Sequence, residues 1–149
     1  PVIGKMYDKY GPRAVITPGT ILVIIGYALY ASFGVDTPVG AMVCTHVMWM
    51  LGVGMVLAST QTNTLNSLPR EYYPDGIALT QTIQQVAGAI GIAVMVSLLS
   101  ARQASELAAG VALPDATASG STFVFIVGLI LAVINFILSL FMKKPGHIK

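Results

Sequence analysis

Charged side chains are scarce in this sequence, and acidic ones are the scarcer sign. Asp, Glu, Lys and Arg make up 9% of the 149 residues, against about 25% in soluble domains. Four stretches hold none of them: residues 14–35, 37–69, 76–101 and 116–142. Each stretch is longer than the ~20 residues that a helix needs to cross a bilayer. The missing charge excludes a soluble globular fold and predicts an all-α polytopic membrane protein, because helices satisfy their own backbone in lipid.

Other absences narrow the function. Cys44 is the single cysteine, so no intrachain disulfide can form. The His, Cys, Asp and Glu residues follow no metal-ligand spacing, and the sequence has neither a phosphate-binding glycine loop nor a nucleophile motif. A clustered basic face with aromatic readers is also missing, which excludes a nucleic-acid partner. We therefore expect no enzyme activity, no metal and no cofactor.

The uncharged stretches predict four spans, at residues 14–33, 39–68, 77–100 and 122–142, with an outer loop over residues 101–121. The first ten residues of that loop are enough for a short surface helix, and the rest is flexible in composition. Lysine and arginine orient these spans. Seven of the 8 Lys and Arg residues lie before the first span, between the second and third, or after the fourth. Because positive residues in short flanks stay in the cytoplasm, we predict a multi-pass protein of the cell membrane with both ends of this segment cytoplasmic.

Small and polar residues predict which helix faces meet other helices. Gly19 and Gly26 lie on one face of the first span and permit close helix contact. Ala87, Gly88 and Gly91 do the same in the third span. The second span carries a polar stripe at spacings of three, four and seven residues. This stripe consists of Thr45, His46, Trp49, Gly52, Ser59, Thr60 and Asn63.

The charged segment GKMYDKYGPR comes before the first predicted span. Its Gly4, Asp8, Lys9, Gly11 and Arg13 reproduce the loop motif G-x-x-x-D-[RK]-x-G-x-[RK], so the sequence resembles the major facilitator superfamily. The resemblance implies a cytoplasmic loop between two helices of one transporter half, in agreement with the orientation derived from charge. It also implies a gating cluster that holds two helices together in one conformation and releases them in another. An ordinary positive-inside loop with a turn glycine is the alternative.

A second resemblance lies in the stretch LPREYYPDGIALTQTIQQVAGAIGIAV, residues 68–94. It is similar to a region near the C-terminus of fourteen-span drug:proton antiporters of the EmrB/QacA type. Together the two resemblances imply that residues 1–149 are a C-terminal, four-helix piece of a major facilitator fold. The implied function is secondary multidrug efflux in exchange for protons by alternating access. The implied partners are small amphipathic or cationic drugs, protons, membrane lipid and the remaining helices of the transporter.

By this resemblance the second span lines the substrate cavity, so Thr45, His46, Trp49 and Asn63 are candidate lining residues. His46 is the one residue within a predicted span that titrates near neutral pH, and the Trp49 ring suits stacking on an aromatic or cationic drug. The alternative is that these polar groups only bond to neighbouring helices or water. A self-standing four-span protein with a structural or partner-binding role is the alternative function.

Overall fold

The structure, a computed structural model, describes residues 9–141. It contains the helices α2 (Arg13–Ala31), α3 (Val39–Leu65), α4 (Tyr73–Ala108) and α5 (Leu113–Ser139), and the short 3-10 helix η1 (Arg70–Tyr72). All four long helices are apolar enough to cross a membrane, and no strand occurs between residues 9 and 141. The predicted all-α membrane class is confirmed.

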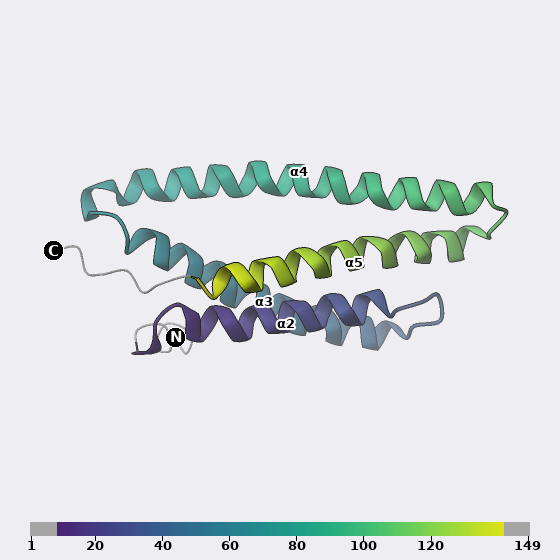
Figure 1. Cartoon of the computed structure of the whole chain (residues 1–149), viewed down its shortest axis with the longest axis horizontal. Coiled ribbons are helices and arrows are strands. Elements are labelled where there is room, and N and C mark those ends of the chain that lie inside the picture. Colours follow the sequence, from purple (N-terminus) through teal and green to yellow (C-terminus); the bar gives the residue numbers. More distant parts are fainter. Residues whose placement is uncertain (1–8, 142–149) are drawn as a thin grey trace.

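The helices form a row in the order α3, α2, α5, α4. Helix α2 packs against both α3 and α5, and α5 also packs against α4 (Figure 1). Helices α3 and α4 are adjacent in sequence but make few contacts, which include Gly76 of α4 against Leu65 and Leu68. Helices α3 and α4 therefore lie apart over most of their length, with α2 and α5 between them (Figure 1).

Glycines bring α2 and α3 into close contact. A Cβ atom added to Gly52 would lie 2.6 Å from the Gly19 carbonyl oxygen, and one added to Gly26 would lie 2.6 Å from Cδ1 of Trp49. Such distances are below van der Waals contact, so only glycine fits at these positions. The close contact predicted for the Gly19 and Gly26 face is confirmed, and its partner is the polar helix α3.

Most of the segment predicted as an outer loop, residues 101–121, is helical, and only residues 109–112 connect the two helices. Whether this segment faces outward stays a prediction. Helix α4 continues to Ala108, and α5 begins at Leu113 rather than at residue 122. The charges at Arg102 and Glu106 were taken to end the span, but charge marks where a helix leaves the hydrocarbon and does not stop the helix itself. Alanine, leucine, glutamate and arginine, which predominate there, are good helix formers.

The turn between α4 and α5 has an identifiable geometry. Gly110 adopts φ +82°, a left-handed conformation that favours glycine. The Gly110 N–H donates to Leu107 O at 3.0 Å, and the Val111 N–H donates to Glu106 O at 3.1 Å. These two bonds form a Schellman motif, which satisfies the last carbonyls of the helix. The chain then reverses within four residues to start α5.

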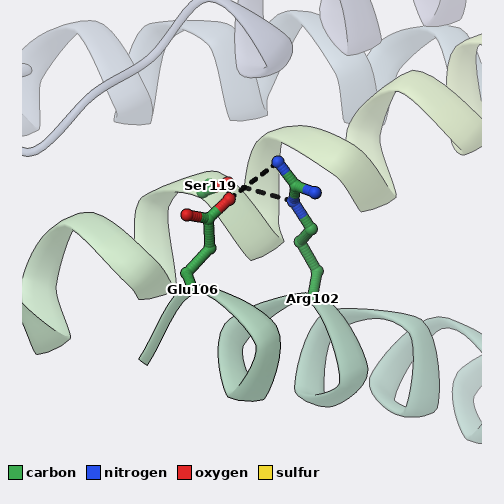
Figure 2. A network of polar contacts seen from close by, with 3 residues as sticks. All are labelled: Arg102, Glu106 and Ser119. Carbon is green, nitrogen blue, oxygen red and sulfur yellow. Dashed lines mark hydrogen bonds and ion pairs between the residues drawn. The ribbon is translucent and has the colours of Figure 1, made fainter. Parts of the chain in front are cut away.

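A polar cluster joins α4 to α5 beside this turn (Figure 2). Arg102 forms an ion pair with Glu106 at 2.7 Å. The Ser119 hydroxyl donates to Oε1 of Glu106 at 3.1 Å and accepts from Nε of Arg102 at 3.4 Å. Gln103 donates to the Thr117 hydroxyl at 2.7 Å. Exposed ion pairs contribute little alone, but bonds from both helices hold this end of the hairpin in register.

Helix α4 lies at the edge of the row and has no buried residue. Its large apolar side chains are mostly exposed, among them Ile83, Ile90 and Ile92, with 59–69% of their surface open. Such a face is stable only against lipid tails or further helices.

The orientation remains a prediction, and cysteine labelling in intact cells checks it. In a Cys44→Ser background, an impermeant thiol reagent is expected to label Ala109→Cys, which is exposed in the α4–α5 turn. Lys144→Cys should be protected until the membrane is permeabilised, because the Lys and Arg bias places that end in the cytoplasm. The reverse labelling pattern would overturn the predicted orientation.

Candidate functional site

An aromatic pocket of about 370 Å³ lies between the four helices. It is within the size range of small-molecule sites. Every helix contributes to its wall. The lining residues are Tyr27 and Tyr30 from α2, His46 and Trp49 from α3, Met95 from α4, and Val124, Phe125 and Gly128 from α5. We refer to it below as the aromatic pocket.

The rings of the aromatic pocket are ordered by contacts between helices. Tyr27 meets Trp49 edge to face, with 5.7 Å between ring centroids. Tyr30 stacks on Phe125 at 4.8 Å with 17° between the planes. The Tyr27 ring packs directly against Gly128, where there is no room for a side chain, because a Cβ atom at that position would lie 2.6 Å from the ring. The geometry presents flat aromatic surfaces, which bind planar or cationic groups well.

The polar groups in this wall are few. The hydroxyl of Tyr30 lies 3.0 Å from Nδ1 of His46, within hydrogen-bond distance. The His46 and Trp49 rings are 6.0 Å apart at 31°. Nε1 of Trp49 is buried and has no hydrogen-bond partner among residues 9–141. The lining contains no Asp, Glu, Lys or Arg.

Two further pockets share residues with the aromatic pocket. One, of about 560 Å³, shares Tyr30 and Phe125 and extends to Phe33 and Leu113 near the helix ends. The other, of about 270 Å³, shares Tyr27, Met95 and Gly128 and extends the other way, to Asn135. The three pockets follow one another along α2, so the aromatic pocket is the middle part of a mostly apolar groove.

The four residues predicted to line a cavity are divided by the structure. His46 and Trp49 line the aromatic pocket. Thr45 is instead buried together with Gly52 and Ser59, at seven-residue intervals on the face of α3 that meets α2. Asn63 lines none of the three pockets and lies fourteen residues from Trp49, about 21 Å along a helix.

The gating motif is only partly within the described residues. Gly4 and Asp8 lie outside them. Gly11 adopts φ +84°, the left-handed turn that only glycine makes freely, just before α2 begins at Arg13. Lys9 places Nζ 5.1 Å from the ring centroid of Tyr10. The role of this motif in gating stays a prediction.

The small residues of α4 have no packing partner in the part of the chain that the structure covers. Ala87 and Gly88 are exposed, and Gly91 is half-buried. A Cβ atom added to Gly88 or Gly91 would meet nothing within 4 Å. Their role in helix packing also stays a prediction, and it now requires a helix from outside residues 9–141.

Sequence reasoning missed most of the pocket wall. Tyr27 and Tyr30 are three residues apart and share a face of α2, which was an available signal. Nothing in the sequence connects that face with Met95 or Phe125, because these contacts exist only after the helices pack.

Several known proteins are similar to this chain in sequence. The profile described as Major Facilitator Superfamily matches residues 1–92. The lincomycin resistance protein LmrB of Bacillus subtilis (strain 168) is 37% identical over 150 residues, and that of Listeria monocytogenes is 40% identical over 149 residues. The uncharacterized MFS-type transporter YcnB of Bacillus subtilis is 31% identical over 145 residues. No solved structure matches this chain.

These matches cover 97% of this chain but only 30–32% of each relative, so the chain spans about a third of their length. The matched region includes the gating motif, the polar helix α3 and most of the α4 segment whose resemblance was noted from sequence. Since the family profile covers more than half of the 149 residues, this chain belongs to the major facilitator superfamily.

Proposed function

We propose that the chain forms part of a secondary active transporter that exports drug-like compounds in exchange for protons by alternating access. The observation that carries the proposal is the aromatic pocket, which takes side chains from all four helices. Trp49 lies three residues from Gly52, the centre of α3, and so about 4.5 Å from the middle of that helix. Transporter substrate sites characteristically lie near the bilayer midplane.

The nature of the wall supports the substrate class. Stacked and edge-on rings with no charged residue suit compounds that are flat, apolar and weakly or positively charged. Relatives named for lincomycin resistance support export of drugs in general. The similarity of residues 68–94 to EmrB/QacA-type antiporters further supports a fourteen-span transporter with the proton as the coupling ion.

Efflux from proteoliposomes tests this proposal. The complete transporter that contains this chain is reconstituted, and the movement of ethidium and of lincomycin is followed with and without an imposed pH gradient. We expect transport of at least one compound that accelerates with the gradient and stops when a protonophore collapses it. Transport of neither compound under any gradient would contradict the proposal.

The gating motif gives a second prediction for the same assay. Asp8→Asn should leave expression unchanged and reduce efflux about fivefold or more, because it removes the acidic charge of a motif whose other charges, Lys9 and Arg13, are positive. Such charge and helix-dipole interactions are worth up to about 1–2 kcal/mol. Asp36→Asn, in the exposed α2–α3 connection, is the matched control and should keep normal efflux. Equal efflux in both variants would show that the charges of the motif only orient the chain in the membrane.

A further inference from the structure

His46 is the histidine in the wall of the aromatic pocket. Its ring is in the wall of the aromatic pocket, 3.0 Å from the Tyr30 hydroxyl through Nδ1 and 6.0 Å from the Trp49 ring. Histidine is the side chain whose charge changes between about pH 5 and 8. No Asp or Glu of residues 9–141 lies in the lining, so among these residues the imidazole is the side chain there that can accept a proton.

Protonation changes what this ring does to its neighbours. A neutral imidazole has one N–H and one bare nitrogen, and its Nδ1 either accepts from the Tyr30 hydroxyl or donates to it. The proton binds the bare nitrogen and later leaves from the same atom. In the imidazolium form both nitrogens donate, so Nδ1 donates to the Tyr30 oxygen and a full positive charge lies beside the Trp49 face. That face then interacts with the imidazolium, not with a ligand cation.

Among residues 9–141, the wall of the aromatic pocket offers this charge no carboxylate partner. The titratable groups facing His46 are Tyr27 and Tyr30 from α2, which are neutral near pH 7. Helix α5 contributes Val124, Phe125 and Gly128, and α4 contributes Met95. The nearest charge along α4, Arg102, is seven residues from Met95, about 10 Å along the helix, and is paired with Glu106. A positive charge on His46 therefore repels any cation in the aromatic pocket.

We propose that His46 is the residue at which a proton and an aromatic cation exclude each other, which makes it the coupling residue of the exchange. This inference rests on the function proposed above. On the side where the proton is scarce the neutral ring leaves the aromatic pocket free for a cation. On the acidic side the imidazolium repels the cation and promotes its release. The same pocket thus carries either the drug or the proton.

Equilibrium binding of ethidium to the purified complete transporter tests the inference. Between about pH 7.5 and pH 5.5 the Kd of the wild type is expected to rise about tenfold, because acid favours the charged imidazolium, which repels the cation. His46→Gln should hold its Kd within about twofold across the same range. His147→Gln alters the other histidine of this sequence and should behave as the wild type. His46→Arg, with a fixed charge, should bind weakly at both pH values.

An uncharged aromatic probe, N-phenyl-1-naphthylamine, separates charge repulsion from a general effect of acid. Its Kd is expected to change less than about twofold in the wild type. The inference is overturned if it weakens as much as ethidium does, if ethidium binding by the wild type does not depend on pH, or if His46→Gln and His46→Arg retain the wild-type pH dependence. Gradient-driven efflux is measured on the same preparation. Efflux present alongside any of these results leaves the proposed function standing, whereas efflux absent from the wild type overturns that function itself.

Discussion

Gly52→Ala is expected to destabilise the complete transporter by about 1–3 kcal/mol, the usual cost of overpacking a close contact. The added methyl would lie 2.6 Å from the Gly19 carbonyl oxygen and 2.9 Å from Cβ of Leu22. The first of these is backbone and cannot rotate away. The two helices must therefore separate, which also loosens the neighbouring contact of Gly26 with Trp49. Gly52→Val should be worse and reduce the yield of folded protein.

Fluorescence-detected size exclusion after heating measures this effect as a lower apparent melting temperature. Gly40→Ala is the matched control on the same helix, because a Cβ atom there meets nothing within 4 Å. It should change stability by less than about 0.5 kcal/mol, as substitutions away from close contacts do. If Gly52→Ala and Gly40→Ala melt at the same temperature, the close approach of α2 and α3 does not limit stability.

Trp49→Ala is expected to raise the Kd for ethidium about tenfold or more. The substitution removes the ring that contacts both Tyr27 and His46, at 5.7 and 6.0 Å between centroids. A cation–π contact away from water is worth about 2 kcal/mol, and each 1.4 kcal/mol is about tenfold in affinity. Efflux of ethidium should fall in parallel.

Two further variants separate the lost ring from a damaged fold. Trp49→Phe keeps an aromatic face and should retain affinity within about threefold, although it removes the Nε1 donor that is unpartnered among the described residues. Met50→Ala truncates the next residue, which is exposed and outside the pocket lining, and should bind normally. Loss of binding in all three variants would indicate a general disturbance of α3. Normal binding by Trp49→Ala would show that the Trp49 ring does not contribute to ethidium binding.

The polar stripe of the second span shows how much of the site could be predicted from the sequence. Its period identified one side of α3, but a helical stripe is wide enough to include both residues buried against a neighbouring helix and residues that line a pocket. Thr45, Gly52 and Ser59 are buried where α3 meets α2, whereas His46 and Trp49 contact Tyr30 and Tyr27 of α2 and also line the aromatic pocket. A one-residue step along a helix rotates the side chain by about 100°, which is enough to separate Thr45 from His46.

The sequence predicted a short surface helix at residues 101–110 but not that it continues the third span without a break as α4. Charges at Arg102 and Glu106 indicate contact with water, and water is compatible with helix as well as with loop. Good helix formers favour the continuation, and these side chains also pair with each other and with Ser119 of α5. That pairing depends on the position of the next helix, which the local pattern does not contain.

The sequence alone determined that this is a membrane protein and how many long helices it has, because charge and hydropathy are properties of each segment by itself. It also contained the motif and the small residues that predict the family and the α2–α3 contact. Only the tertiary structure decided the order α3, α2, α5, α4 and the meeting of Tyr30, His46, Trp49 and Phe125 in one pocket. The physical reason is that packing joins residues far apart in the chain, and the fit of side chains between helices, not the pattern along any one of them, selects the partners.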